Sequence, residues 1–161
     1  MHLLDTDVLW ALRKPPGEQA DEGLSAWIAD TAPANLFLSV ATVLELEGGT
    51  GRIQRREKLL GGALRGWLDT QVRPAFEGRI LPIDAAIARR WGQLSYPDPR
   101  DGLLAATALE HGFTVVTRDT AAFKLGRVRT LNPWTYRPSA PDAGWDEGSL
   151  TGSIWLKSLF R

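Results

Sequence analysis

The 161-residue sequence contains no cysteine, which excludes disulfide bonds, thiolate nucleophiles and cysteine-ligated zinc. Its two histidines, His2 and His111, are too far apart in the sequence to form an H-x-x-x-H metal motif. Any metal ion that the chain binds must therefore be held mainly by oxygen ligands.

Long apolar runs are also missing. No run approaches the ~20 residues that span a bilayer, and Asp5 interrupts the start of the chain before a signal-peptide core can form. We therefore expect a cytoplasmic protein with no membrane segment. Hydrophobic residues make up 43% and charged residues 24% of the chain, which are ordinary values for a globular protein.

The chain carries no net charge, because 19 Lys and Arg residues balance 19 Asp and Glu residues. Binding of nucleic acid through bulk charge is therefore not expected. The basic residues are nevertheless clustered locally, and four of them are candidate phosphate contacts: Arg52, Arg55, Arg56 and Lys58. The alternative for this cluster is a solvated helix surface.

Five short apolar runs predict β-strands at residues 2–6, 36–40, 79–83, 114–117 and 128–131. Apolar residues at helical spacing lie between these runs, so strands and helices alternate. This alternation predicts an α/β fold with a mostly parallel five-stranded sheet that is covered on both faces. Ligands of such folds bind beyond the carboxyl ends of the strands.

Glycines mark two expected helix ends. Gly112 follows His111 where a C-terminal cap belongs, and His111 itself suits the surface of the last helical turn. Gly48, Gly49 and Gly51 predict a break or turn after the helix that carries Glu45. Residues 48–51 also resemble a phosphate-binding loop, but they lack its Lys-Ser/Thr and follow a helix rather than a strand.

Four acidic residues are expected at one edge of the sheet. Asp5 follows the first strand, Asp119 follows the fourth, Glu45 lies one turn into a helix, and Asp101 opens the helix 101–108. Carboxylates this close repel one another unless a cation compensates their charge, and an all-oxygen set suits Mg²⁺ or Mn²⁺. Each acid taken singly could instead be a helix cap or a turn former.

Three further residues complete the candidate site. Asp7 and Asp98 are possible additional acids, and the Thr117 hydroxyl is expected to support the site.

Five segments in order resemble a known family. They are Leu3-Leu-Asp-Thr-Asp-Val8, Leu38-Ser-Val-Ala-Thr-Val-Leu-Glu-Leu46, Asp101-Gly-Leu-Leu-Ala-Ala-Thr-Ala108, Thr117-Arg-Asp-Thr-Ala-Ala-Phe123 and Asn132-Pro-Trp134. In this order and spacing the chain resembles PIN-domain ribonucleases, and most closely the VapC and FitB type toxins of bacterial toxin-antitoxin pairs. Position 7 is more often Asn in that family, so Asp7 adds a carboxylate.

The resemblance implies a three-layer α/β/α fold and an Mg²⁺-dependent endoribonuclease, with Mn²⁺ as a possible substitute. It implies that Asp5, Glu45, Asp101 and Asp119 form the metal-binding acidic cluster. It also implies a homodimer and an antitoxin that blocks the site and brings the complex to operator DNA. The basic residues of the cluster described above would then contact the RNA.

The resemblance covers about residues 1–134, which we predict to be the nuclease domain. Residues 135–161 are predicted to be a linker rich in Pro and Gly followed by a short apolar tail with Trp155 and Phe160. One hypothesis is that this tail docks on the surface that an antitoxin would use, with Lys157 or Arg161 near the acids. The alternative is an extension with no docking role.

Two other functions fit parts of the sequence. The Asp-Thr-Asp of residues 5–7 resembles the D-x-D signature of aspartyl-phosphate phosphatases, but the downstream lysine and second acidic motif of those enzymes are not evident. A PIN-like regulatory module without catalytic activity is the other alternative.

Overall fold

The computed structural model describes residues 1–13 and 21–138. The segment 14–20 and residues 139–161 of the predicted linker and tail (135–161) lie outside the described residues, so the docking hypothesis for the tail stays a prediction. The elements, in chain order, are β1 (His2–Leu4), α1 (Thr6–Leu12), α2 (Glu22–Asp30), η1 (Pro33–Asn35), β2 (Leu36–Ser39), α3 (Val40–Arg56), α4 (Lys58–Trp67), η2 (Leu68–Val72), α5 (Arg73–Ala75), β3 (Ile80–Leu81), α6 (Ala85–Trp91), α7 (Pro99–His111), β4 (Thr114–Val116), β5 (Thr130–Leu131) and η3 (Pro133–Thr135).

The strands form one parallel sheet in the order β3-β2-β1-β4-β5. The α/β class and the parallel five-stranded sheet predicted from the sequence are confirmed. Each strand begins within two residues of its predicted start, although the strands are shorter than the apolar runs. The order of the strands reverses between β1 and β4, and a crevice at such a switch point is where α/β proteins bind ligands.

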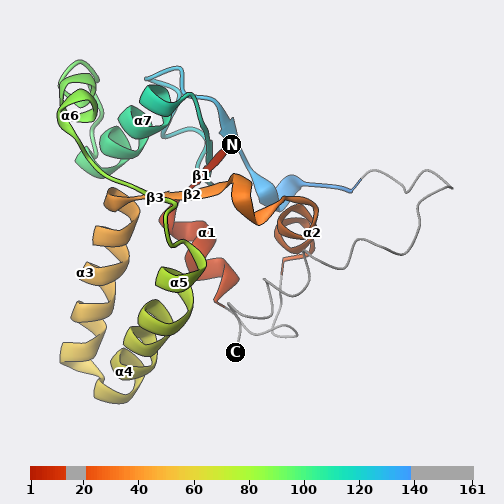
Figure 1. Cartoon of the computed structure of the whole chain (residues 1–161), viewed down its shortest axis with the longest axis vertical. Helices are drawn as coiled ribbons and strands as arrows, with labels where there is room; N and C mark the ends of the chain where they lie inside the picture. The colour runs from red at the N-terminus through yellow and green to blue at the C-terminus, as the bar shows by residue number, and fades with distance from the viewer. Residues whose placement is uncertain (14–20, 139–161) are drawn as a thin grey trace, which may run out of the picture.

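Helices cover both faces of the sheet (Figure 1), as a parallel sheet requires. Successive residues of β1 point to opposite faces, so Leu3 and Leu4 belong to different cores. Leu4 packs with α1, α2, α3 and α4, whereas Leu3 packs with residues of α7 such as Leu104. Small residues of α7, including the fully buried Ala105, let this helix lie close against the sheet.

The helix that carries Glu45 continues through the glycines, so the break predicted at residues 48–51 is wrong. Helix α3 runs from Val40 to Arg56, and the turn to α4 comes at Glu57. Packing overrides the poor helix propensity of glycine here, because Leu46 and Thr50 are buried on the inner side of α3. α3 and α4 form a helical hairpin, and Glu47 of α3 pairs with Arg65 of α4 and with Arg73 of α5.

Two other helix ends are also defined. Gly112 caps α7 in the left-handed conformation at φ 67°, as predicted. Asp98 is the N-cap of α7, so this helix begins earlier than expected and Asp101 lies in its first turn. In the part of the chain that the structure describes, no helix has the length and apolar character needed to span a membrane.

Candidate active site

Asp5 lies where β1 ends. Its backbone N–H donates to the carbonyl of Val116 at 3.0 Å, which continues the pairing of β1 with β4 for one residue. Its side chain caps α1 by accepting the Thr6 N–H at 2.7 Å. The cap that was the structural alternative for Asp5 is therefore present, and it holds the carboxylate at the edge of the sheet.

The segment after β4 lies beside Asp5. The buried Thr117 hydroxyl is hydrogen-bonded to Asp5 and accepts the Asp119 N–H at 3.1 Å. The Arg118 N–H donates to Asp7 Oδ2 at 2.8 Å. Asp119 Oδ1 accepts two backbone N–H groups, those of Ala121 and Ala122, so Asp119 also forms a turn.

Glu45 approaches from α3. Its Oε2 atom accepts the Thr6 hydroxyl at 2.7 Å, and its Oε1 atom accepts Arg100 Nη1 at 2.8 Å. Both carboxylate oxygens of Glu45 are thus hydrogen-bonded to side chains from other elements.

These side chains line one open cleft of about 350 Å³ at the carboxyl edge of the sheet. Its acidic residues come from α1 and the end of β1, from α3, from α7 and from the segment after β4. The lining residues are Asp5, Thr6, Asp7, Trp10, Glu45, Gly49, Arg52, Arg100, Asp101, Thr117 and Asp119. The four acids predicted as a cluster, together with Asp7 and Thr117, therefore share this cleft.

Burial and mutual repulsion change the acidity of the cleft. Burial and the nearby charge of Asp7 raise the pKa of Asp5 to about 6, although hydrogen bonds from Thr117 and Thr6 oppose the change. Burial also raises the pKa of Asp7. The pKa of Asp101 is raised by burial and then by the charge of Asp98. The cleft therefore disfavours the ionised state of several of its own carboxyl groups.

The residues fit a hard divalent cation by their chemistry. The donors are carboxylate oxygens, the ligands that Mg²⁺ and Mn²⁺ prefer, and the buried Oδ1 atom of Asp7 has no hydrogen-bond partner. Within residues 1–13 and 21–138, no three acidic or histidine side chains already stand arranged around a common ion. The cleft thus contains the carboxylate oxygens that such an ion needs, whereas both oxygens of Glu45 are hydrogen-bonded to Thr6 and Arg100.

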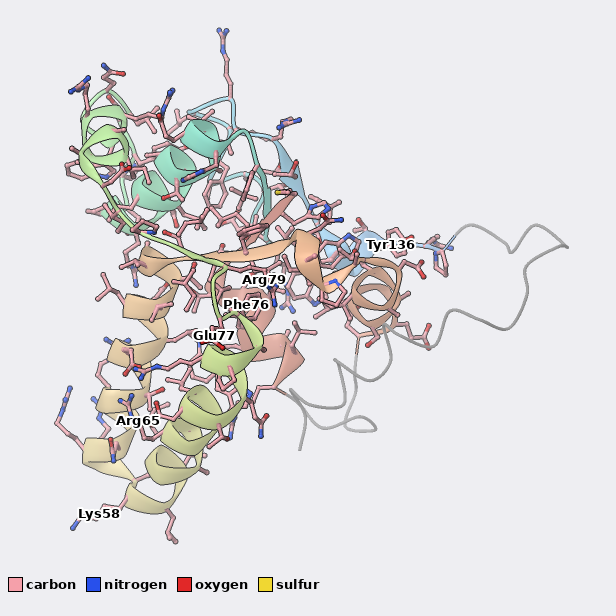
Figure 2. The ribbon with its side chains drawn as sticks, in the orientation of Figure 1. Lys58, Arg65, Phe76, Glu77, Arg79 and Tyr136 are labelled. Atoms are coloured by element: carbon pink, nitrogen blue, oxygen red, sulfur yellow. The ribbon has the colours of Figure 1, made fainter. Side chains whose placement is uncertain are left out.

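Other predicted residues lie outside the cleft. Asp98 does not line it, because its carboxylate caps α7 and pairs with Arg100 at 2.6 Å. Of the four predicted basic contacts, Arg52 lines the cleft, and its side chain extends back over Gly48 and Gly49. Arg55, Arg56 and Lys58 are exposed at the far end of the α3–α4 hairpin, where Figure 2 labels Lys58.

Four cleft residues were not predicted as site residues from the sequence: Thr6, Trp10, Gly49 and Arg100. Thr6 and Arg100 each adjoin a predicted acid in the sequence, which was the available signal. Their roles depend on contacts with Glu45, 39 and 55 positions away, and a single sequence does not display such contacts.

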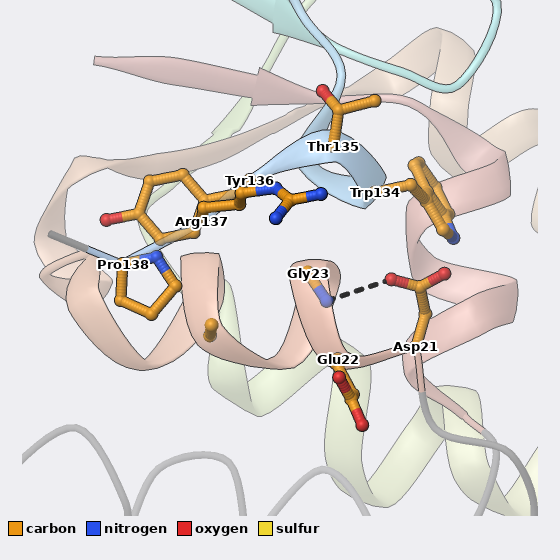
Figure 3. Close-up of a pocket in the computed structure, with 9 residues that line it drawn as sticks. Asp21, Glu22, Gly23, Trp134, Thr135, Tyr136, Arg137 and Pro138 are labelled. Atoms are coloured by element: carbon orange, nitrogen blue, oxygen red, sulfur yellow. Dashed lines mark hydrogen bonds between the residues drawn. The ribbon is translucent and has the colours of Figure 1, made fainter. Parts of the chain in front are cut away.

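A second hollow lies between α2 and η3 (Figure 3), and it has a different character. Asp21 caps α2 there by accepting the Gly23 N–H at 3.0 Å. A Cβ atom at Gly23 would lie 2.5 Å from the carbonyl oxygen of Trp134, so glycine permits this close packing of η3 on α2. The predicted acidic site residues are all absent from its lining.

The fold and the acidic cleft define an α/β protein with its site at the switch point of a parallel sheet. The family model for the PIN domain matches residues 2–128, and the chain belongs to this family. The family assignment predicted from the sequence is thereby confirmed.

Named relatives agree with this assignment. The chain is 36% identical to Toxin FitB of Neisseria gonorrhoeae over 142 residues, which cover 83% of this chain and 99% of that protein. It is 35% identical to VapC ribonuclease Y4jK of Sinorhizobium fredii, over 83% of this chain and 98% of the relative. The crystal structure of FitAcB from Neisseria gonorrhoeae contains a chain that superposes with a TM-score of 0.75, at 35% identity, over 84% of this chain and 99% of that one.

Proposed function

We propose that this protein is a divalent-metal-dependent endoribonuclease and the toxin of a toxin-antitoxin pair. The observation that carries the proposal is the meeting of five carboxylates in one cleft of a PIN-domain chain: Asp5, Asp7, Glu45, Asp101 and Asp119. The relatives named Toxin FitB and VapC ribonuclease support this activity. Since RNA is the substrate, we expect the protein to act in the cytoplasm.

The acidic residues would hold and orient the ion. Asp5, Glu45, Asp101 and Asp119 are the proposed ligands, and Asp7 contributes the buried oxygen without a partner. When bound, Mg²⁺ or Mn²⁺ would activate water and neutralise phosphate charge.

The chain's own residues position these groups. Thr117 holds Asp5 through its hydroxyl, and Thr6 holds one oxygen of Glu45. In the proposed reaction a water oxygen bonds to phosphorus in line and the bond to the 3′ oxygen breaks. The products are a 5′-phosphate and a 3′-hydroxyl, with no covalent enzyme intermediate.

The basic side of the site suits an RNA backbone. Arg52 stands at the cleft, while Arg55, Arg56 and Lys58 extend the positive charge along the α3–α4 hairpin. Phosphate contacts of this kind position a strand without selecting its bases.

A protein partner is part of the proposal. The solved relatives include FitAB bound to an IR36 DNA fragment, whose matching chain has a TM-score of 0.74 at 33% identity. By analogy we propose that this chain forms a homodimer, binds a cognate antitoxin and reaches operator DNA only through that antitoxin.

The test exposes total RNA to the purified protein with Mg²⁺, with Mn²⁺ or with EDTA, and uses Asp5→Asn as the control. We expect cleavage with either ion and none with EDTA or with the variant. No cleavage of any RNA by a protein that still binds its antitoxin would favour the catalytically silent regulatory module. Cleavage in EDTA would contradict the proposed metal dependence.

A further inference from the structure

Two basic side chains, Arg52 and Arg100, line the acidic cleft, and Arg100 forms an ion pair there with a proposed metal ligand. Arg100, in the first turn of α7, places Nη1 2.8 Å from Oε1 of Glu45 on α3. This positive charge therefore sits among the carboxylates that the proposed function assigns to the metal.

Asp98 fixes the position of Arg100. The carboxylate of Asp98 accepts Arg100 Nε at 3.1 Å, Nη2 at 2.6 Å and the Arg100 backbone N–H at 2.8 Å. The two side-chain bonds form the bidentate pair that a planar guanidinium makes with a carboxylate. Arg100 is thus anchored at the start of α7 on one side and bound to Glu45 on the other.

These contacts change the acidity of Asp98 and of Arg100. The hydrogen bonds from Arg100 lower the pKa of Asp98. The pKa of Arg100 is raised, first by its hydrogen bond to Asp98 and then by the charge of Glu45. The side chain of Arg100 is 58% exposed and that of Glu45 is 31% exposed, so the pair between them lies at the rim of the cleft, within reach of solvent.

The contact with Arg100 opposes binding of an ion at Glu45. The second oxygen of Glu45 is bound by Thr6, so an ion that binds this carboxylate must either displace Arg100 or tolerate a positive charge beside it. Displacing Arg100 breaks its hydrogen bond to Glu45, and keeping it places two positive charges beside the same carboxylate, where they repel each other.

We propose that Arg100 is the internal counter-ion of Glu45, a positioning residue that competes with the divalent cation for this carboxylate. Asp98 acts through Arg100 by keeping the guanidinium at the cleft. This inference rests on the proposed metal-dependent function and adds to it a residue that sets the concentration of metal at which the site fills.

The experiment measures binding of Mn²⁺ alone to the RNA-free protein, from the electron paramagnetic resonance signal of the unbound ion. The variants are Arg100→Gln, the charge-conserving Arg100→Lys, and Arg90→Gln as the matched control. Arg90 forms a similar ion pair with Glu110 at 2.7 Å, on α6 and away from the cleft lining.

We expect Arg100→Gln to bind Mn²⁺ about three- to tenfold more tightly than the unmodified protein, because a repelling charge is gone. Arg90→Gln should match the unmodified protein, and Arg100→Lys should fall between the two. Unchanged affinity in Arg100→Gln would overturn the inference. Weaker binding would also overturn it, because Arg100 would then help Glu45 to bind the ion.

A double-mutant cycle tests the role of Asp98. Asn remains a good N-cap, so Asp98→Asn removes the charge of the anchor while it keeps the helix start. We expect Asp98→Asn to change the Mn²⁺ affinity in the unmodified background and to have much less effect in the Arg100→Gln background. Equal effects in both backgrounds would contradict action through Arg100.

Asp5→Asn separates this inference from the function on which it rests. If the unmodified protein binds no Mn²⁺, the metal site and the inference both fail. If the unmodified protein binds Mn²⁺ and Asp5→Asn does not, the metal site stands. An unchanged affinity of Arg100→Gln would then reject only the competition.

Discussion

The Thr6 hydroxyl donates a hydrogen bond of 2.7 Å to Oε2 of Glu45, and this bond joins α1 to α3 across 39 positions of the sequence. Thr6 directly follows Asp5 and is only 7% exposed. The orientation of Glu45 is therefore set by a buried neighbour of the first acid of the cleft.

Replacing Thr6 by valine keeps the shape of the side chain and removes the donor. We expect RNA cleavage to fall about tenfold, and the free energy of unfolding to fall by about 1 to 2 kcal/mol, because the Glu45 carboxylate loses one of its two hydrogen-bond partners while Arg100 remains. Thr6→Ser, which keeps the hydroxyl, should retain most of the RNA cleavage activity and most of the stability. The control is Thr70→Val, which removes an exposed hydroxyl bond to the Gly66 carbonyl. Equal activity of Thr6→Val and Thr70→Val would contradict the role given to Thr6.

The raised pKa of Asp5 predicts that ionisation of this side chain destabilises the folded protein in a pH-dependent way. The folded protein holds the Asp5 proton up to about pH 6, whereas the ordinary value is 3.8, so ionisation of Asp5 opposes folding. This destabilisation is absent below about pH 4, grows between about pH 4 and 6, and reaches its full size above about pH 6. In EDTA at pH 8, Asp5→Asn should therefore be more stable than the unmodified protein by about 1 to 3 kcal/mol.

Urea denaturation at pH 4 and pH 8 measures this difference. The advantage of Asp5→Asn should disappear at pH 4. Added Mg²⁺ should stabilise the unmodified protein and leave the variant unchanged. A variant that is less stable than the unmodified protein at pH 8 would show that Asp5 stabilises the metal-free fold.

Two neighbouring glycines of α4 should respond in opposite ways to alanine. A Cβ atom at Gly61 would meet the backbone of Gln54 and lie 2.7 Å from its nitrogen, whereas a Cβ atom at Gly62 would meet nothing within 4 Å. Gly61→Ala should therefore cost about 2 to 4 kcal/mol of stability through overpacking of the hairpin. Gly62→Ala should gain up to about 1 kcal/mol from helix propensity. Equal shifts in the urea midpoints would contradict the close approach of α3 and α4.

The basic residues of the α3–α4 hairpin should act through phosphate. Changing any one of Arg52, Arg55, Arg56 or Lys58 to glutamine should flatten the dependence of log affinity on log salt by ~0.7 for single-stranded RNA. The cleavage position should not move. Arg89→Gln, on the exposed side of α6, is the charge-matched control. Four salt slopes equal to that of the control would instead indicate a solvated helix surface.

The sequence was sufficient for the fold because each strand is an apolar run and the helices between them keep a regular spacing. The sharing of one cleft by Asp5, Glu45, Asp101 and Asp119 followed from the rule that parallel strands end at the same edge. Their roles as metal ligands stay a prediction. Local patterns of this kind do not require knowledge of contacts between distant residues.

The prediction that failed depended on contacts between distant parts of the chain. Gly48 and Gly49 looked like a helix end, but packing of α3 against its neighbours continues the helix past them. Asp98, predicted as a possible additional acid, does not line the cleft, because its carboxylate caps α7 and pairs with Arg100. The continuation of α3 depends on tertiary packing that the sequence alone does not display, whereas the contacts of Asp98 are local, with Arg100 two residues away.

The central claim is hydrolysis of RNA by a metal-dependent acidic site, and the most direct measurement is cleavage of one RNA oligonucleotide in ¹⁸O-labelled water. With Mg²⁺ and in a single turnover, we predict one ¹⁸O atom in the new 5′-phosphate, a free 3′-hydroxyl, and no product with EDTA or with Asp5→Asn. A 2′,3′-cyclic phosphate end, or the same product in EDTA, would contradict the account.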